Sequence, residues 1–575
     1  MGGAGQAGPA LLQRGKMKTM LKPRQMIFLV AVLLLLFLVA LPLSLLFFKS
    51  FVRDGVLTMA NYVEVFSEPK NYAPLWNTVK LGLWTVLLAT ALGLPLGWLV
   101  ARTDLPGRRW LETLCLLPYM LPPFIGAIAW TQLLAPRVGY LNKLWTMITG
   151  LRSSLFNIYS FEGIVWVLGM YTFPFVFLTV RGALERMNPS LEEVARISGA
   201  GKLRVLKDIT IPLVMPSILA GMILSFLYSI SNFGVPALIG MRARVFVITT
   251  QIFRYIYQRA DFSGIRLATA LSVLLVGVAG LVLALNRWVL SRQHGAAIIS
   301  GKSVRPTIVE LGRWRHPIAV GVHLLMAFLV LAPLVSVLLS SFLKAWGLPI
   351  RWENLTFRNY AYILFDYDLT KRAILNSLLL AVSAATVTTL VGGILAYITT
   401  KTRIKGRQAL DFLSTLPHSI PGTVVALAMI LAWSGQFKIN LYNTFWIILV
   451  AYITRYLFYS FRNISAALVQ IHPSLEEAAR ISGAGWLQNF RDIVVPLIKP
   501  GLIAGWLLVF MPTLRELTVS ILLYGPKTPT ISVAVFELQD AGYYHIAAAL
   551  SVIIVAVLLV CNYVARKLIG LGVRA

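Results

Sequence analysis

Long apolar stretches, each about as long as a membrane-spanning helix, alternate with short polar segments along the whole chain. A helix needs roughly 20 mostly apolar residues to cross a bilayer, and about twelve segments of this sequence reach that length. We place them near 26–48, 78–101, 112–134, 162–181, 214–238, 266–287, 317–343, 376–400, 412–434, 444–463, 500–523 and 544–566. The pattern predicts an all-α integral membrane protein with about 12 transmembrane helices.

The composition is that of a protein embedded in lipid. Of the 575 residues, 58% are apolar and only 13% are charged, which is too little charge for the surface of a soluble chain of this length. The two cysteines, Cys115 and Cys561, both fall inside predicted spans. We therefore expect the lipid bilayer as the main environment, and neither a disulfide nor a metal site.

The net charge of +30 (52 Lys and Arg against 22 Asp and Glu) would suggest nucleic acid in a soluble protein. Sorted by predicted side of the membrane, about 31 basic and 11 acidic residues share the side of the N-terminus, against about 19 and 10 opposite. Because cytoplasmic loops are enriched in Lys and Arg, we predict cytoplasmic N- and C-termini and no nucleic-acid partner. The outer surplus faces either a docked protein or lipid phosphate, and it lies mainly in Arg242, Arg244, Arg254, Arg259 and Arg266.

The chain contains an internal repeat. Leu191–Gly221 and Leu475–Gly505 are identical at 18 of 31 positions, at an offset of 284 residues. A Pro-x-x-x-Pro pair at 118–122 and 417–421 has an offset of 299, so the first half has about 15 extra residues in between. The sequence predicts two tandem parallel six-helix repeats. The expected divisions are a cytoplasmic tail 1–25, a first repeat 26–287, a cytoplasmic linker 288–316, a second repeat 317–566 and a tail 567–575.

Both strong repeats fall in a predicted cytoplasmic loop, at 190–212 and 474–496. Ser190 and Ser474 each begin a Ser-x-x-Glu capping box that starts a helix. Gly199 and Gly483 stop that helix by allowing a left-handed C-terminal residue. A second short helix then ends before a proline. A stiffening hairpin is the structural alternative, but the duplication favours a surface that meets similar partners twice.

The duplicated loop resembles the EAA loop of binding-protein-dependent ABC-transporter permeases. The motif Glu-x-Ala-x-x-x-Gly, nine residues and Ile-x-x-Pro is supplied by Glu193, Ala195, Gly199, Ile209 and Pro212, and again by Glu477, Ala479, Gly483, Ile493 and Pro496. Val194 departs mildly from the family pattern, which usually has Ala there. The resemblance implies docking onto two copies of a cytosolic ABC ATPase subunit. The candidate coupling residues are Glu192, Glu193, Ala195, Arg196, Gly199, Glu476, Glu477, Ala479, Arg480 and Gly483.

ATP binding by the chain itself is not expected. Ser198-Gly-Ala-Gly-Lys202 lacks the first Gly and the final Ser or Thr of a phosphate-binding loop. The second copy has Trp486 instead of the lysine. The six histidines are scattered and form no metal-ligating motif. We expect a permease without enzymatic activity or bound cofactors, with ATP and Mg held by the partner ATPases.

A second motif keeps an alternative open. Asp104-Leu-Pro-Gly107-Arg108-Arg109 resembles the signature of major-facilitator transporters, which also have twelve spans in two parallel halves. Its match is partial, and the second half offers only Lys405-Gly-Arg407. An ATP-independent secondary transporter is therefore the alternative to an ABC permease.

Charges inside predicted spans mark either a translocation pathway or ties between helices. Arg455, Arg515 and Glu516 are such residues, and the repeat places Tyr171 opposite Arg455 and Asn232 opposite Glu516. We take Asn232, Arg455, Arg515 and Glu516 as candidate pathway residues. The two halves should then be chemically unequal.

The segment Arg515-Glu-Leu-Thr-Val-Ser-Ile-Leu-Leu-Tyr-Gly-Pro526 looks like fused permeases of the ferric-iron uptake family, and this resemblance extends over essentially the whole chain. It implies a bacterial inner-membrane importer that receives ferric iron from an extracytoplasmic solute-binding protein. Related permeases serve thiamine, phosphonate, sulfate or polyamine, so these substrates stay open.

Overall fold

A computed structural model describes residues 23–151, 153–188, 190–258, 262–292, 308–402 and 404–568. Most of both predicted tails and most of the linker lie outside these residues. The described part is almost entirely helical, and its one sheet is a short hairpin of β1 (Val52–Arg53) and β2 (Val56–Leu57). The prediction of an all-α chain is confirmed.

The first repeat folds into the following elements: α1 (Pro23–Leu35), η1 (Leu36–Ala40), α2 (Leu41–Ser50), α3 (Ala60–Ser67), α4 (Pro69–Arg102), α5 (Arg108–Met120), α6 (Pro123–Leu134), α7 (Tyr140–Thr149), α8 (Phe161–Arg186), α9 (Ser190–Ile197), α10 (Lys202–Val205), η2 (Leu206–Thr210), α11 (Ile211–Ser231), η3 (Pro236–Gly240), α12 (Ile248–Gln258) and α13 (Phe262–Arg292). Helix α7 lies in the stretch where the first half has about 15 more residues than the second.

The second repeat folds into the following elements: η4 (Gly312–Trp314), α14 (Arg315–Met326), η5 (Ala327–Leu331), α15 (Ala332–Ser341), η6 (Trp352–Asn354), α16 (Arg358–Ala361), η7 (Tyr362–Asp366), α17 (Asp368–Lys401), α18 (Arg407–Thr415), η8 (Leu416–Ser419), α19 (Gly422–Trp433), α20 (Phe445–Val469), α21 (Pro473–Ile481), α22 (Trp486–Asn489), η9 (Phe490–Val494), α23 (Val495–Leu514), α24 (Ser520–Leu523), α25 (Ile531–Asp540) and α26 (Tyr544–Leu568).

Each of the twelve predicted spans corresponds to helical structure. Within the described residues, nine helices are long and apolar enough to cross a membrane, and two bent helix pairs qualify if each is one span. The remaining predicted span, 444–463, is α20, which carries Arg455 and Arg462.

Two of the predicted spans are sharply bent. Helix α5 meets α6 at 107°, and the segment α18–η8 meets α19 at 113°. The cause is proline, which disfavours helical geometry in the residue before it. Leu121 and Ile420, each followed by a proline, are extended with ψ of 150° and 133°.

Proline also explains wide π turns that recur in both halves. The turns η1, η2, η5 and η9 are each followed by a residue whose N–H bonds to the carbonyl five residues earlier. A proline comes next in every case: Pro42, Pro212, Pro333 and Pro496. Since proline has no N–H to continue the regular ladder, the helix widens there by one residue.

The two repeats are interlocked through their first spans. The segment α1–η1–α2 packs on α18, α19 and α20 of the second repeat, while α14–η5–α15 packs on α5 and α6 of the first. Phe37 and Trp433 lie 4.1 Å apart between ring centroids. Thr454 Oγ1 donates to the Leu38 carbonyl at 3.1 Å, and Ser340 Oγ donates to Gln132 Oε1 at 3.0 Å.

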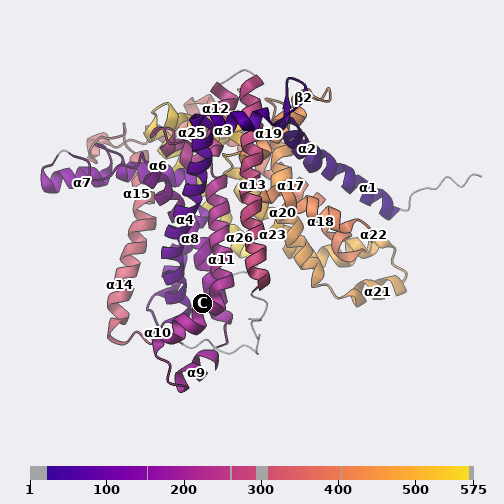
Figure 1. Cartoon of the computed structure of the whole chain (residues 1–575), viewed down its shortest axis with the longest axis horizontal. Helices are drawn as coiled ribbons and strands as arrows, with labels where there is room; N and C mark the ends of the chain where they lie inside the picture. Colours follow the sequence, from indigo (N-terminus) through magenta and orange to yellow (C-terminus); the bar gives the residue numbers. More distant parts are fainter. Residues whose placement is uncertain are drawn as a thin grey trace, which may run out of the picture.

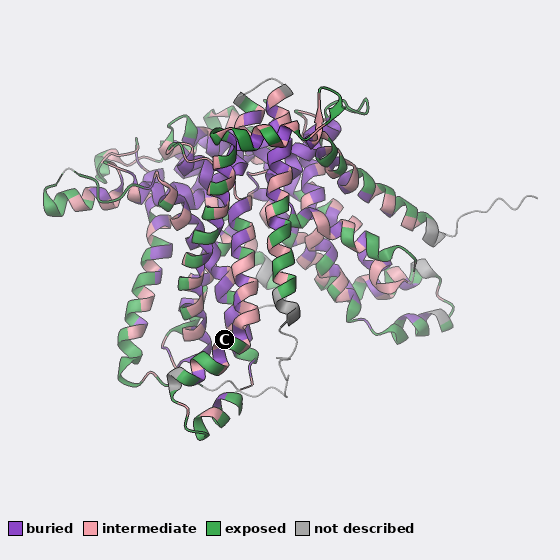
Figure 2. Ribbon diagram, viewed as in Figure 1, coloured by how far each residue is buried: buried purple, intermediate pink, exposed green. Residues whose placement is uncertain are grey.

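The long helices form two groups that meet at one end of the molecule. Figure 1 shows α4, α8 and α11 standing over α9, and α17, α20 and α23 standing over α21, with the feet of the two groups apart. Buried residues gather at the opposite, upper end, where the repeats are joined (Figure 2). We call the end with α9 and α21 the coupling end, and the other the joined end.

Candidate functional site

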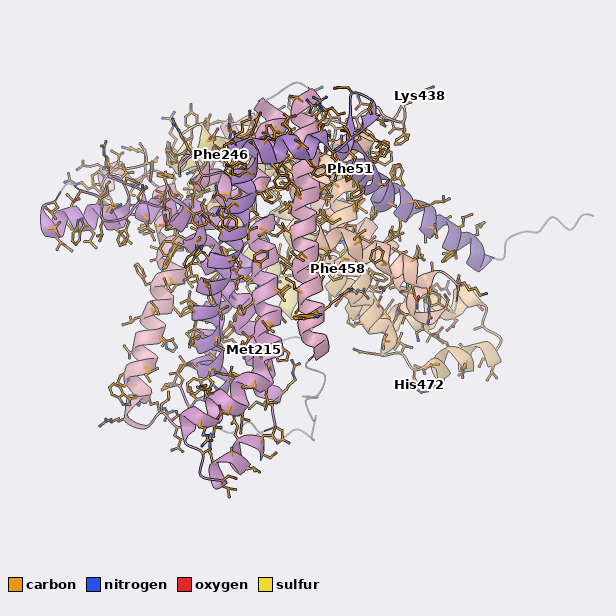
Figure 3. All side chains as sticks on the ribbon, viewed as in Figure 1. Phe51, Met215, Phe246, Lys438, Phe458 and His472 are labelled. Carbon is orange, nitrogen blue, oxygen red and sulfur yellow. The ribbon has the colours of Figure 1, made fainter. Side chains whose placement is uncertain are left out.

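The duplicated loops form helix–turn–helix elements at the coupling end. At the start of α9 the N–H of Ser190 bonds to Asn188 Oδ1 at 3.0 Å, and at the start of α21 the N–H of Ser474 bonds to His472 Nδ1 at 3.3 Å. In each helix, a side chain two residues earlier therefore satisfies a backbone donor of the first turn. His472 marks the foot of the second group in Figure 3.

The predicted ends of these helices are confirmed. Gly199 and Gly483 have φ of +86° and +84°, in the left-handed region that favours glycine. Behind them, the N–H of Ala200 bonds to the Ala195 carbonyl, and that of Ala484 bonds to the Ala479 carbonyl, both at 2.9 Å. These six-to-one bonds are typical of a Schellman ending.

One glutamate of each predicted coupling set points into the protein. Glu192 is buried; it accepts from Arg102 Nη2 at 3.3 Å and from Thr210 Oγ1 at 2.7 Å. Glu476 is also buried and lies 3.0 Å from Lys401 Nζ. Arg102 and Lys401 end α4 and α17. These pairs therefore hold each coupling helix to the foot of a long span.

The opposite face of each helix is exposed and partly apolar. Ile197 and Ile481 are each 87% exposed. The exposed apolar positions repeat every three residues in both copies: Leu191, Val194 and Ile197 in α9, and Leu475, Ala478 and Ile481 in α21. Glu193, Arg196 and Glu477 are exposed as well, whereas Ala195 is half-buried and Ala479 is buried. The side chain of Arg480 lies outside the described part.

The fifth span of each repeat unwinds before it reaches the joined end. Helix α11 ends before Asn232, and α23 ends before Arg515. After each break, a side chain accepts a backbone N–H three residues on: Asn232 Oδ1 from Val235 at 3.0 Å, and Glu516 Oε1 from Val519 at 2.8 Å. The two residues are equivalent in the repeat, so one structural role is filled once by a neutral amide and once by a carboxylate.

Polar side chains from both repeats gather at these breaks. Arg515 donates to the Met120 carbonyl, which is at the end of α5 in the other repeat. The Tyr456 hydroxyl donates to Glu516, and Arg455 lies within electrostatic range of that carboxylate. Tyr119, Arg455 and Arg515 lie within electrostatic range of the Tyr459 phenol, and Tyr119 and Arg515 lie within that range of Tyr228. We call this group the midspan cluster: Tyr119, Tyr228, His418, Arg455, Tyr456, Tyr459, Arg515 and Glu516.

Two aromatic pairs line the cluster in repeat-related positions. Tyr119 and Phe175 lie 5.6 Å apart edge to face, and His418 and Tyr459 lie 5.0 Å apart in the same arrangement. His418 also stacks on Phe458 at 4.3 Å. Figure 3 places Phe458 about midway between Lys438 at the joined end and His472 at the coupling end. The cluster therefore lies near the middle of the spans.

The structure brings together three of the predicted pathway residues, Arg455, Arg515 and Glu516, and puts Asn232 at the equivalent break. Five members of the cluster were not among the predicted residues: Tyr119, Tyr228, His418, Tyr456 and Tyr459. A signal for two of them was present, because Tyr119 and His418 each follow the first proline of the repeated Pro-x-x-x-Pro pair. The described residues contain no group of three or more His, Cys, Asp or Glu able to hold a metal ion.

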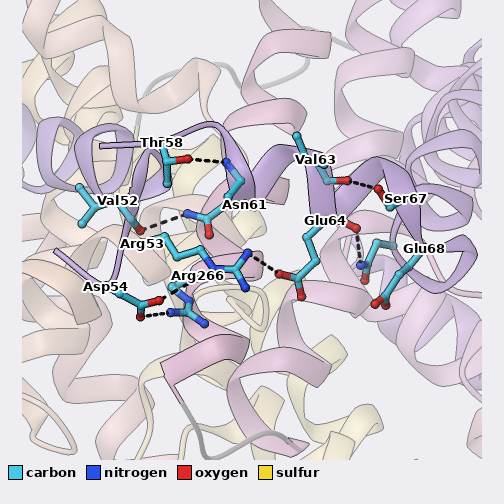
Figure 4. Close-up of polar contacts among 12 residues, drawn as sticks. Val52, Arg53, Asp54, Thr58, Asn61, Val63, Glu64, Ser67, Glu68 and Arg266 are labelled. Carbon is cyan, nitrogen blue, oxygen red and sulfur yellow. Dashed lines mark hydrogen bonds and ion pairs between the residues drawn. The ribbon is translucent and has the colours of Figure 1, made fainter. Parts of the chain in front are cut away.

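The outer arginines are partly engaged inside the protein. Arg266 pairs with Asp54 at 2.7 Å, beside an Arg53–Glu64 pair at 3.2 Å (Figure 4). Arg254 lies 4.1 Å from the ring of Phe246. Arg259 lies outside the described residues. The prediction of five arginines facing a partner or lipid is thus too broad.

Arg242 joins the two repeats at the joined end. It donates to Tyr544 Oη at 2.6 Å and to the Gln539 carbonyl at 3.0 Å, both in the second repeat. It also stacks near Tyr159, whose pKa is raised by burial although Arg242 opposes this. A neutral phenol at this position makes the contact a cation–π interaction.

The segment that resembled a major-facilitator signature has a structural role. Asp104 accepts the N–H of Leu311 at 3.0 Å and pairs with Arg315 at 3.4 Å. His323 Nε2 lies 3.2 Å from the Gly107 carbonyl. The segment therefore anchors the start of α14, the first span of the second repeat.

Comparison with known proteins gives a consistent result. Residues 93–291 and 388–574 each match the family described as binding-protein-dependent transport system inner membrane component. The two matches cover the coupling loops, both breaks and the midspan cluster.

Individual relatives differ in how much of the chain they match. The ferric transport system permease protein FbpB of Actinobacillus pleuropneumoniae is 25% identical over 92% of this chain and 76% of its own length. A protein of Salmonella paratyphi A, PhnV, named for 2-aminoethylphosphonate transport, is 29% identical over 42% of this chain and 90% of its own length. A bacterial ABC transporter for alginate import aligns with 44% of this chain and 96% of its own, at 23% identity and a TM-score of 0.36.

Proposed function

The chain belongs to the family of binding-protein-dependent transport system inner membrane components, and from this premise we propose that it imports ferric iron at the expense of ATP hydrolysed by partner subunits. It is a multi-pass inner-membrane permease of an ABC importer. Its coupling end would face the cytoplasm, with both termini on that side. Its joined end would receive substrate from an extracytoplasmic solute-binding protein.

The observation that carries the proposal is the pair of coupling helices. Each exposes an apolar face at equivalent positions while a buried ion pair ties its inner face to a long span. A buried pair resists rearrangement because separating the charges leaves each of them unpaired. Movement of an ATPase docked on α9 would therefore pass into α4, and movement on α21 into α17. Binding of ATP and Mg would be left to the two ATPase subunits.

Iron is proposed as the substrate because the FbpB similarity spans both repeats, whereas the phosphonate-transport relative matches less than half of the chain. Thiamine, phosphonate, sulfate and polyamine remain the alternatives of the same transporter type. An ATP-independent secondary transporter is the alternative of a different type. The engagement of Asp104 by Leu311 and Arg315 gives that alternative no specific support.

The test is isolation of the chain from its native membrane, followed by identification of co-purifying ATPase subunits and measurement of ATP-dependent ⁵⁵Fe(III) uptake. Gly199→Val and Gly483→Val each force a branched side chain into a left-handed conformation, at a cost of about 1–2 kcal/mol. We expect the double variant to lose most ATPase binding and most uptake.

Gly150→Val is the matched control, since Gly150 ends α7 with φ of +72° away from the coupling end. It should retain both ATPase binding and uptake. Isolation without any ATPase subunit, together with normal uptake by the double variant, would rule out the importer.

A further inference from the structure

The charges of the midspan cluster do not balance. The cluster contains two guanidinium groups, on Arg455 and Arg515, and one carboxylate, on Glu516. That carboxylate is already engaged, because it accepts the Tyr456 hydroxyl and the Val519 N–H. The buried Nη1 of Arg455 has no hydrogen-bond partner. A positive surplus in the middle of a membrane is unfavourable unless an anion compensates it.

The hydrogen-bonding groups of the cluster are mostly donors. The hydroxyls of Tyr119, Tyr228 and Tyr459 can each donate a hydrogen bond. Arginine has N–H donors and no acceptor. A bare ferric ion has a high positive charge, which the guanidinium groups of Arg455 and Arg515 would repel. Donors and positive charge instead match the oxygens of a carboxylate or phosphate group.

We propose that the substrate passes the midspan cluster as an oxyanion: the ferric ion crosses with carboxylate or phosphate ligands still attached, and not as bare Fe³⁺. This inference rests on the proposed function and narrows its substrate. Arg455 binds the oxyanion through its unpartnered Nη1, and Arg515 lies across the cluster beside the opposite repeat. A phosphonate without iron presents the same kind of anionic oxygens. The experiment must therefore distinguish an oxyanion bound to ferric iron from an iron-free phosphonate.

The experiment uses the complete transporter in proteoliposomes, with its ATPase subunits and solute-binding protein. One arm supplies ⁵⁵Fe(III) with ¹⁴C-citrate, a second supplies ⁵⁵Fe(III) with ³²P-phosphate, and a third supplies ¹⁴C-2-aminoethylphosphonate without iron. We expect ⁵⁵Fe to accumulate together with at least one oxyanion label in a constant ratio. Accumulation of ⁵⁵Fe without either anion label overturns the inference.

The remaining outcomes separate the inference from the proposed function. Accumulation of the phosphonate in the iron-free arm supports an oxyanion site and overturns ferric iron as the substrate. Accumulation of no label in any arm overturns the proposed function, and the inference with it.

Variants test the role of Arg455 directly. Arg455→Gln should lower uptake of both labels about 10-fold, the loss expected for one charge-assisted hydrogen bond. Arg455→Lys keeps the charge and should stay within about threefold of wild type. The matched control is Arg462→Gln on the same helix, where Arg462 pairs with Asp411 at 3.0 Å outside the cluster. Co-purification of the ATPase verifies assembly, and wild-type uptake by Arg455→Gln overturns the inference.

Discussion

The two broken spans make the same turn with different chemistry. In the first repeat, Asn232 caps the Val235 N–H with a neutral amide. In the second, Glu516 caps the Val519 N–H with a carboxylate that also accepts the Tyr456 hydroxyl. The backbone geometry has been kept through the duplication while the charge has not. We infer that the backbone geometry common to both repeats serves the scaffold, and that the difference in charge between them serves binding of the substrate.

The largest effect should come from removing the charge of the second break. Glu516→Gln keeps an oxygen that can accept the Val519 N–H but leaves the two arginines uncompensated. Unpairing a buried charge costs about 3 kcal/mol, which corresponds to about 100-fold in rate. We expect turnover in an uptake assay to fall by that order while substrate binding does not weaken, because release of an anion becomes slower. ATPase co-purification should be unchanged.

Asn232→Ala is the companion change in the first repeat. It removes a cap and no charge, so we expect a loss of about 1 kcal/mol of stability and an uptake loss of about fivefold. If Asn232→Ala were as severe as Glu516→Gln, the cap and not the charge would explain both effects. Unchanged uptake by Glu516→Gln would remove that residue from the pathway.

A smaller effect should distinguish the two buried ion pairs that hold the coupling helices, Arg102–Glu192 and Lys401–Glu476. Thr210 donates to Glu192, whereas the equivalent position in the second repeat is Val494, which has no hydroxyl to donate to Glu476. Arg102 is also more buried than Lys401, with 2% against 12% of the side chain exposed. We expect Glu192→Gln to weaken ATPase binding about 10-fold and Glu476→Gln about threefold.

Affinity for the purified ATPase subunit measures this difference. Glu185→Gln is a suitable control, because Glu185 forms a partly exposed i, i+4 pair with Arg181 near the same end. Equal losses in the two coupling variants would show that the additional threonine contributes nothing.

The smallest effect should come from Asp104→Asn, at a position where the second repeat has Arg403. The variant loses the Arg315 ion pair but keeps an oxygen for the Leu311 N–H. Partly exposed pairs of this kind contribute up to about 1 kcal/mol, so thermal stability should fall slightly and uptake should stay within about twofold. Abolished uptake with normal stability would instead favour the secondary-transporter alternative.

Local features of the fold were predictable from the sequence. The ends of the coupling helices follow from Gly199 and Gly483, since glycine adopts φ near +85° without strain. The spans follow from their apolar length. The sharp bends at Leu121 and Ile420 were missed, although the following prolines were visible, because hydropathy counts apolar residues and does not register helix breaks.

Contacts between residues far apart in the sequence could not be predicted. Nothing in the repeat sequence indicates that Glu192 faces Arg102, because the two residues are 90 positions apart. The midspan cluster draws residues from both repeats, and its contacts depend on how the repeats are docked. Arg515 reaches the Met120 carbonyl across 395 residues. The charged members of the cluster stand out in an apolar sequence, whereas the tyrosines and His418 that surround them do not.

The interlocked first spans set the order in which the protein can be assembled. The surface that covers α1 and α2 is synthesised much later, since Leu38 and its partner Thr454 are separated by 416 residues. At about 5–20 residues per second, the first span waits roughly 20–80 s in the membrane for its partner. The second repeat has no such delay, because α5 and α6 are in place before α14 and α15 emerge. The N-terminal span can therefore pack onto the second repeat only after α18, α19 and α20 have been made.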